Sequence, residues 1–308
     1  ELILKKNGDF EMIFRDIELG DREWLDKKFK EDNKKACEFC FANNYLWRKY
    51  FPTQIAQESD CVLLRYYSEN DTMYVFPIGA GDKKKALEQL FLYGQAKGEQ
   101  IHLYGLLDYE VDQLKEWFPK HFRYEADRDM FDYIYETEHL TNLSGKKFHG
   151  KRNHIARFMD DDDWEYETLN SENVQECIDM NNNWIQKKYD DDAWSQEVQD
   201  EYDVVKCALI DYKRLGLVGG VLRKYGDVVA FELGEPLCDD TFVVHFEKAY
   251  ADVQGAYPMI NKQFVLHECQ DYKYVNREED DGEEGLRKAK LSYHPDILLE
   301  KYNAYKIG

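Results

Sequence analysis

The sequence contains no apolar run that approaches the roughly 20 residues a helix needs to cross a bilayer. Its first residues, ELILKK, also lack the apolar stretch of a secretory signal peptide. From these absences we expect a cytoplasmic protein without a membrane span.

Positive charge is scarce as well. Lys and Arg number 41 against 62 Asp and Glu, which gives a formal net charge of -21. Such a charge creates a field that repels polyanions at long range. General nucleic-acid binding is therefore disfavoured, and a tRNA partner is expected only if a local basic patch holds it.

Paired metal ligands are missing too. The seven cysteines are an odd number and lie scattered through apolar stretches, which is typical of reduced thiols in an intracellular protein. Cys37 and Cys40 form a C-x-x-C, but no second cysteine pair or nearby histidine pair completes a zinc site. The four consecutive aspartates at 160–163 lack the glycine and the terminal glutamate of a calcium loop. We therefore expect no metal site.

What the chain does have is enough apolar sequence for a large core. Of its 308 residues 43% are hydrophobic, which suits one large or two medium domains. Helical and strand-like periods alternate along it. The expected strands are 61–67, 72–76, 101–105, 164–169, 218–224, 228–233, 241–247, 272–278 and 302–307, and the expected helices are 22–30, 82–96, 174–189, 196–214, 257–268 and 284–292. This order predicts an α/β (α+β) fold with one architecture used twice, in domains 1–145 and 161–308.

The segment 146–160 between the expected domains is basic. There is no acidic residue from His139 to Met159, while Lys146, Lys147, Lys151, Arg152 and Arg157 are cationic. One interpretation is a solvated linker whose cations pair with the following aspartates, because exposed ion pairs are common and weak. The other is a surface on which Lys146, Lys147 and Arg152 hold a phosphorylated substrate.

The strand expected at 241–247 carries polar residues among apolar ones. Period-two alternation places His245 and Glu247 on one face as neighbours. An imidazole beside a carboxylate can take a proton from an attacking amine, as acyl transfer requires. The alternative is a satisfied His–Glu pair at a sheet edge.

These residues, taken with their neighbours, carry a resemblance. The segments KKFHGKRNH (146–154), HFEK (245–248), GAYPMIN (255–261), VNREED (275–280) and LRKAKLSY (286–293) resemble proteins similar to the C-terminal domain of phosphatidylglycerol lysyltransferases. The resemblance spans about 140–308 and extends more loosely over the first half, at 38–47. It implies two tandem GNAT-like domains, each a mixed central sheet flanked by helices. It also implies kinship with Fem-type enzymes, which move an aminoacyl group from a charged tRNA to an acceptor.

The resemblance implies a donor site after the strand at 241–247. GNAT enzymes hold the pyrophosphate of coenzyme A on a loop and a helix N-terminus. The corresponding residues are Gln254, Gly255, Ala256, Tyr257 and Asn261. The match to the GNAT loop is partial, because Asp stands at its first position and Tyr at its last. A plain strand-to-helix turn is the alternative.

Further substrate-binding and catalytic residues are expected near the C-terminus. Asn276 and Glu278 can fix an amine and Arg277 can clamp a carboxylate or phosphate, unless they form a buried network. Lys290 and Tyr293 lie three residues apart on one helix face. The resemblance makes Tyr293 the acid that protonates the leaving thiolate, whereas a core tyrosine is the alternative in a chain with 23 tyrosines.

Together these observations predict a GNAT-fold acyl- or aminoacyl-transferase. Its donor would be acyl-CoA or aminoacyl-tRNA, its acceptor an amine or a hydroxyl, and its cofactor none that binds tightly, with a coenzyme A thioester as one candidate donor. The alternative is a non-catalytic GNAT-fold module that senses an amino acid or a nucleotide. The sequence leaves the oligomeric state open.

Overall fold

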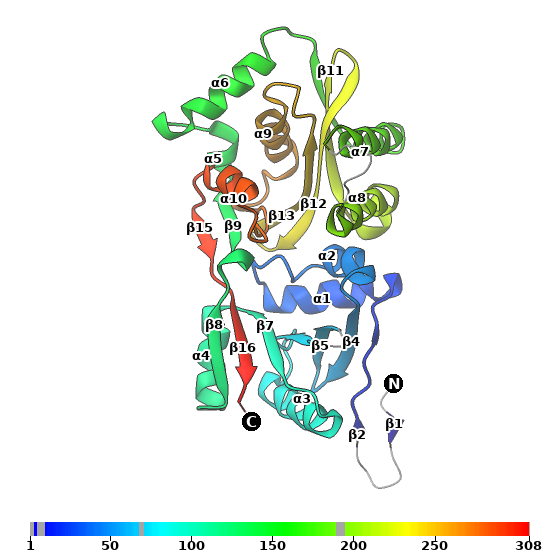
Figure 1. The fold of residues 1–308 in the computed structure, drawn as a ribbon, viewed down its shortest axis with the longest axis vertical. Coiled ribbons are helices and arrows are strands. Elements are labelled where there is room, and N and C mark those ends of the chain that lie inside the picture. Colours follow the sequence, from blue (N-terminus) through cyan, green and yellow to red (C-terminus); the bar gives the residue numbers. More distant parts are fainter. Residues whose placement is uncertain (1–2, 5–9, 68–70, 189–194, 308) are drawn as a thin grey trace. The chain divides into compact units, whose positions relative to one another are not determined.

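The computed structural model describes residues 3–4, 10–67, 71–188 and 195–307, shown in Figure 1. The chain forms two compact units, each built from segments that are not continuous in the sequence. Unit 1 comprises Glu1–Asp132, Glu279–Glu284 and Leu298–Gly308, and unit 2 comprises Tyr133–Glu278 and Gly285–Ile297. Within the described residues, no helix is both long and apolar enough to cross a membrane.

Unit 1 is built on a 7-stranded mixed sheet. Its strands, in spatial order, are β3 Arg15–Asp16, β4 Thr53–Glu58, β5 Cys61–Tyr66, β6 Met73–Val75, β7 His102–Leu106, β16 Tyr302–Lys306 and β8 Phe122–Ala126. Neighbouring strands are antiparallel except β6 and β7, which are parallel. A small separate sheet pairs β1 Ile3–Leu4 with β2 Phe10–Glu11. The last strand of the chain, β16, thus lies between β7 and β8.

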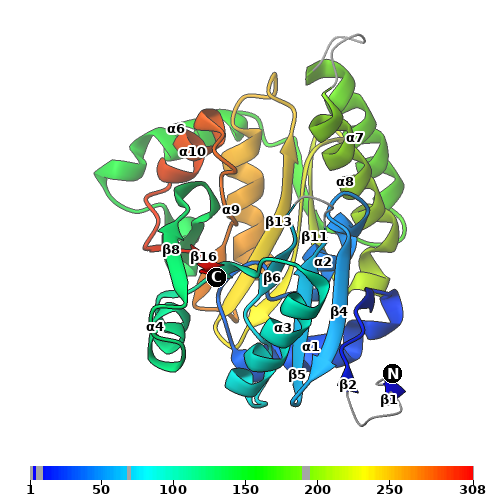
Figure 2. The same cartoon turned by 60° about the horizontal axis from the view of Figure 1, so that its bottom comes forward.

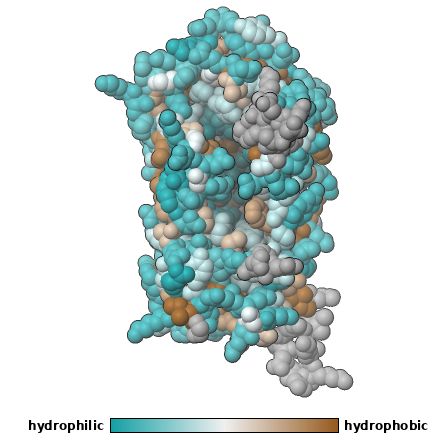
Figure 3. Space-filling view, in the orientation of Figure 1, coloured by the Kyte–Doolittle hydropathy of each residue, from teal (hydrophilic) through white to brown (hydrophobic). Residues whose placement is uncertain are grey.

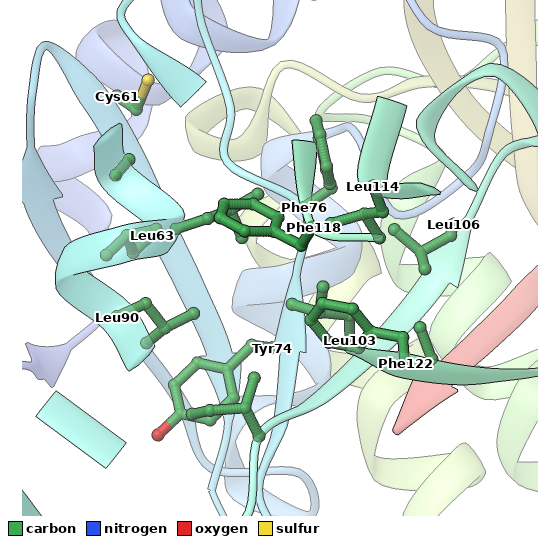
Figure 4. Close-up of a cluster of buried hydrophobic side chains, with 14 of the residues drawn as sticks. Cys61, Leu63, Tyr74, Phe76, Leu90, Leu103, Leu106, Leu114, Phe118 and Phe122 are labelled. Carbon is green, nitrogen blue, oxygen red and sulfur yellow. The ribbon is translucent and has the colours of Figure 1, made fainter. Parts of the chain in front are cut away.

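The helices of unit 1 bury apolar faces on this sheet. They are η1 Leu19–Asp21, α1 Arg22–Asp32, α2 Phe41–Leu46, η2 Trp47–Lys49, α3 Lys83–Lys97, α4 Asp108–Trp117 and η3 Arg128–Met130. Helix α3 begins where the Asp82 side chain accepts the Lys85 N–H, and it ends at the left-handed Gly98. Its buried Leu87 and Leu90 join the core drawn in Figure 4, beside Phe118 and others. Their burial is the main stabilising term of this unit.

Unit 2 also has a 7-stranded mixed sheet. Its strands, in spatial order, are β10 Trp164–Thr168, β11 Val218–Lys224, β12 Asp227–Cys238, β13 Thr241–Ala249, β14 Tyr274–Asn276, β9 Asp132–Glu136 and β15 Ile297–Leu299. Only β13 and β14, among the pairs with a described register, are parallel. The helices are α5 Thr137–Asn142, η4 Lys146–Phe148, α6 His149–Phe158, α7 Val174–Lys188, α8 Gln196–Leu215, α9 Ala256–Glu268 and α10 Glu284–Leu291.

Strands β12 and β13 form the centre of unit 2. Helix α9 packs on one side of them and α7 on the other, as Figures 1 and 2 show. Residues of both faces are consequently buried along β12. A polar side chain on these strands therefore points into the interior and needs a partner there.

The pairing of β12 with β13 contains a β-bulge. Leu233 pairs with Phe246 and Gly234 pairs with Val244, so His245 is the extra residue. A Cβ at Gly234 would lie 2.6 Å from the Phe242 ring, which explains the glycine at this crowded point. A bulge interrupts strict alternation and re-aims the side chain of the extra residue.

The expected fold class is confirmed: each unit has a mixed sheet flanked by helices. The elements expected at 22–30, 82–96, 174–189 and 196–214 are present as α1, α3, α7 and α8. The expected helix 174–189 ends at a residue outside the described part. The basic segment 146–160 forms η4 and α6 within unit 2.

The surface agrees with the high charge of the sequence. Hydrophilic side chains cover most of the face shown in Figure 3, and apolar ones are scattered between them. Scattered apolar residues of this kind are normal on a protein surface. The informative polar residues are therefore the buried ones.

Candidate functional site

His245 lies between two carboxyl groups inside unit 2. Its Nδ1 is 2.8 Å from Glu278 Oε1, and its Nε2 is 3.1 Å from Glu235 Oε1. The imidazole is 2% exposed. Carboxylates at both ring nitrogens favour the protonated form of a histidine, in which both nitrogens donate.

The hydrogen-bond partners described for His245 are Glu235 and Glu278, whereas the sequence placed Glu247 beside it. Strict alternation placed His245 beside Glu247, but the bulge at His245 changes the direction of its side chain. Glu247 instead accepts a hydrogen bond of 2.7 Å from Arg277 Nη2. His245 and Glu247 thus each have hydrogen-bond partners of their own, and their shared catalytic role stays a prediction.

The turn after β14 supplies the partners of both pairs. Glu278 is in the left-handed region (φ 57°), and its N–H donates to Asn276 Oδ1 at 2.7 Å. This local bond fixes the backbone, so Arg277 reaches Glu247 while Glu278 reaches His245. The structure thus brings the predicted group 276–278 to the predicted residues of β13.

A second polar layer lies beneath the Arg277–Glu247 pair. Asn261 Nδ2 is 3.5 Å from Glu247 Oε2 and 3.5 Å from Glu232 Oε1. Glu232 and Asn261 are fully buried. Within the described part of the chain, Glu232 Oε2, Asn261 Oδ1 and Arg277 Nη1 have no hydrogen-bond partner. Asn261, expected to bind a cofactor, therefore lies in this buried cluster.

Tyr293 connects the buried cluster to α6. Its ring lies 4.7 Å from Arg277 Cζ and 3.7 Å from Lys151 Nζ, and it meets the Tyr135 ring edge to face. Tyr135 in turn donates a 2.8 Å hydrogen bond to the carbonyl of Lys290 and so holds the end of α10 in place. The predicted residues Lys290 and Tyr293 are both largely buried.

A cavity of about 220 Å³ opens where α6 meets the start of α9. Its lining includes Lys151 and His154 from α6 and, from the start of α9, the segment Gly255–Pro258. Gly255 has φ 84°, and a Cβ there would overlap the backbone carbonyl of His154. Only glycine permits this close approach, which sets the α9 N-terminus against α6.

Charge and burial adjust the pKa values around the cavity. Burial, followed by the charge of Arg277, lowers the pKa of Lys151 to about 8. Burial raises the pKa of the Tyr293 phenol. Burial lowers the pKa of Arg277, but Glu247 and the other acidic groups around it together outweigh this effect, and the net pKa lies above its usual value. At neutral pH the site therefore holds a phenol, a guanidinium and an ammonium that is easily deprotonated.

The remaining predicted residues lie away from the cavity lining. Gln254 is exposed, as are Lys146 and Lys147 on η4. Arg152 donates from Nη1 to the carbonyls of Leu143 (2.5 Å) and Gly145 (2.7 Å), and so anchors the loop before η4. Of the predicted donor site, the structure thus gathers Gly255, Ala256 and Tyr257.

Lys151 was expected only as one of five cations of a basic surface, and the sequence assigned no site role to four other residues that the structure brings in: His154, Tyr135, Glu232 and Glu235. One signal was available for Lys151 and His154, because a three-residue spacing places two residues on one helix face. It required α6 to be recognised as a helix rather than as a linker.

Two groups of side chains that each lie within a single unit have metal-ligand chemistry. In unit 2, His139 Nδ1 is 2.8 Å from Asp296 Oδ1, and its Nε2 is 3.6 Å from Glu136 Oε2. In unit 1, Cys37 Sγ is 3.3 Å from Asp132 Oδ1 and 2.9 Å from Glu279 Oε2.

The unit 1 group already contains a cation. The buried Lys301 Nζ lies 2.7 Å from both Glu38 Oε1 and Asp132 Oδ1, and 3.4 Å from Cys37 Sγ. Burial lowers the Lys301 pKa, but the surrounding anions outweigh this effect and the net pKa lies well above its ordinary value. The ammonium thus occupies the place that a metal ion would take.

The two sheets with their helices define a tandem GNAT-like fold. A solved structure of FemX shares it, with a TM-score of 0.61 and 10% identity over 96% of this chain and 98% of that one. The chain belongs to the family "Phosphatidylglycerol lysyltransferase, C-terminal", whose model matches residues 30–305.

Individual relatives agree with this assignment. A conserved protein of unknown function from Bacteroides thetaiotaomicron is 36% identical, with a TM-score of 0.90 over 96% of this chain and all (100%) of that one. L-PGS from Bacillus licheniformis is 17% identical, with a TM-score of 0.66 over 93% and 92% of the two chains. An uncharacterised protein of Mycoplasmoides gallisepticum is 23% identical over 66% of this chain, and the match spans 64% of that relative's length.

Proposed function

We propose that unit 2 transfers an acyl or aminoacyl group from an anionic donor to an amine or a hydroxyl. The observation that carries the proposal is the cavity at the α9 N-terminus, lined by Lys151, because the same ammonium contacts the ring of Tyr293. A binding place for an anionic donor thus adjoins a buried phenol and guanidinium. Membership in a lysyltransferase family supports the same class of reaction.

Donor binding would use the backbone and α6. The N-terminal end of α9 lies at the cavity, and the helix dipole favours phosphate oxygens there. The Ala256 N–H already donates to the Val253 carbonyl and Pro258 has no N–H, so side chains must supply further donors. Lys151 and His154 add side-chain donors to the lining. Phosphates of coenzyme A and of the tRNA 3′ end share this chemistry, so acyl-CoA and aminoacyl-tRNA are both candidate donors.

Proton transfer would use the buried pairs. When an amine attacks the acyl carbonyl, its surplus proton must leave, and His245 with Glu235 and Glu278 provides a base whose charged form is stabilised. The raised pKa of Tyr293 keeps the phenol protonated at neutral pH, so it can give its proton to the leaving group. Arg277, held on Glu247, offers a fixed positive charge for the developing oxyanion.

The alternative is a binding module without turnover. One observation favours it: His245 is only 2% exposed and both its ring nitrogens are already engaged. A network of this kind also serves structure alone. Donor binding without transfer is the result that would support this alternative.

The proposal is tested with the full chain and defined donors. Binding of acetyl-CoA and of lysyl-tRNA is measured by thermal shift, because a ligand of the folded state raises the midpoint, and transfer to amine acceptors is followed by mass spectrometry. We expect one donor to bind and react, and Tyr293→Phe to retain binding while losing turnover. Lys213→Ala, an exposed cation on α8, is the control.

The outcomes separate the donors as well as the hypotheses. Affinity for a tRNA donor would fall steeply with salt, because Lys146, Lys147 and Arg157 are exposed beside the cavity helix. Affinity for a coenzyme A donor would fall less, because fewer phosphates are neutralised. If neither donor binds and no transfer is seen, the proposal is overturned.

A further inference from the structure

Glu232 and Glu247 stand directly opposite each other on β12 and β13. They share Asn261, whose amide nitrogen lies 3.5 Å from an oxygen of each. Like charges at opposed positions of an antiparallel pair are destabilising. Two ionised carboxylates in this arrangement, inside the protein, would repel each other strongly.

Arg277 is the cation of this cluster, and its hydrogen bond goes to Glu247. Arg277 Nη2 is 2.7 Å from Glu247 Oε2, and Glu232 Oε2 has no hydrogen-bond partner among the described atoms. The other titratable groups that interact electrostatically with Glu232 are Tyr166 from β10, Cys269 at the end of α9, and Tyr293. Burial raises the pKa of each, so all are neutral at neutral pH. No second positive charge among these groups balances Glu232.

We propose that Glu232 is held as a neutral carboxylic acid and is a positioning residue that keeps Glu247 on Arg277, beside Tyr293. As a neutral group it fills the space opposite Glu247 without repelling it. An ionised Glu232 would compete for Arg277 and pull the guanidinium away from Glu247. The role in catalysis rests on the proposed function, whereas the protonation state does not.

The direction of the pKa agrees with this geometry. Burial, followed by the charge of Glu247, raises the pKa of Glu232 well above its ordinary value. The folded state then binds a proton that the unfolded state releases above about pH 4.3. Stability should therefore fall as pH rises from there toward the folded pKa.

The first experiment needs no substrate. The thermal midpoint of the wild type is compared with that of E232Q, which mimics the neutral acid, between pH 4 and pH 9. We expect the thermal midpoint of E232Q to rise steadily relative to that of the wild type as pH rises. E247Q is the opposite control: it removes the partner of Arg277 and should lower the midpoint at neutral pH. A constant difference between E232Q and the wild type across the range would overturn the proposal.

A spectroscopic readout identifies the proton directly. The infrared difference spectrum of the wild type minus E232Q at pH 7 should contain the carbonyl stretch of a protonated carboxyl group. A carboxylate band in its place means that Glu232 is ionised, and the proposal fails. Circular dichroism of the wild type and of E232Q at pH 7 checks that both are folded when the infrared spectra are recorded.

The positioning role is tested through the pH dependence of acyl transfer. Each pH unit above the pKa of Glu232 reduces its neutral fraction about tenfold, so kcat should decline on the alkaline side in the wild type and decline less in E232Q. E232A should lower kcat more than it changes KM, and E232Q should restore part of the loss. Identical alkaline limbs in the wild type and E232Q would refute positioning. If no transfer is detected at all, the proposed function fails, while the infrared and stability results still decide the protonation state.

Discussion

Replacing Gly255 by alanine tests the junction that forms the cavity. The residue has φ 84°, and an added Cβ would overlap the His154 carbonyl oxygen, with the carbonyl carbon 2.9 Å and Phe158 Cβ 3.1 Å away. Backbone strain of about 1–3 kcal/mol and overpacking of about 1–3 kcal/mol then add. We expect Gly255→Ala to lower the stability of unit 2 by roughly 2–6 kcal/mol.

Urea unfolding measures this effect. With a denaturant slope of about 3 kcal/mol per M, the upper end of the usual range for small proteins, the midpoint should fall by roughly 1–2 M. Because the chain has two compact units, hydrogen exchange of α6 and α9 amides should accompany the measurement and show where the loss occurs. Donor affinity should fall as well, since Gly255 lines the cavity.

Gly150→Ala is the matched control. Gly150 lies in α6, the helix that Gly255 approaches, and a Cβ at Gly150 would meet nothing within 4 Å. The substitution should leave stability unchanged or raise it by about 0.5 kcal/mol. A Gly255→Ala midpoint equal to that of the wild type would show that α6 and α9 separate freely, and the argument that the glycine sets the cavity would be refuted.

Further predictions follow from the charged groups. Because the pKa of Lys151 is about 8, affinity for an anionic donor should weaken between pH 7 and pH 9, and titration calorimetry should find no such dependence in Lys151→Ala. Lys301→Met strands Glu38 and Asp132 without their cation and should cost roughly 3–5 kcal/mol in urea unfolding of unit 1; a smaller loss would mean that the carboxyl groups are neutral. His245→Ala should lower kcat by roughly 10²–10⁴-fold with donor affinity retained, and an unchanged kcat excludes it as the base.

The fold could be predicted from sequence wherever the signal is local. Helix α3, for example, follows from apolar residues at helical spacing between an aspartate cap and a left-handed glycine. The position of β16 could not be predicted in this way. It pairs with β7 and β8, strands far away in the chain, and the strand pattern expected at 302–307 does not identify these partners. Unit 1 therefore includes a segment that sequence order places at the other end of the chain.

In the candidate site, too, some features could be predicted from the local sequence and others depend on distant parts of the chain. Alternation indicated correctly that β13 carries inward polar residues, but it could not reveal the bulge at His245. The bulge depends on how β12 registers against β13 and on the space above Gly234. The hydrogen bonds of His245 to Glu235 and Glu278 likewise join residues far apart in the sequence, which alternation within one strand does not reveal.

Each unit contains a cluster of buried charged groups, and the Lys301 cluster of unit 1 and the Glu232 cluster of unit 2 differ in how fully their atoms are paired. In unit 1 the ammonium of Lys301 is surrounded by anions at hydrogen-bond distance, and none of its partners' atoms there is left unpaired among the described residues. In unit 2, Glu232, Asn261 and Arg277 each retain a buried polar atom without a partner. Because an unpaired buried polar atom costs about 1–3 kcal/mol, folding alone gives no reason to keep such a set. Buried atoms without a hydrogen-bond partner also occur in unit 1, at Asp32, Lys34 and Glu110, so the neighbouring cavity and the lysine of lowered pKa are what distinguish the unit 2 cluster as a functional candidate.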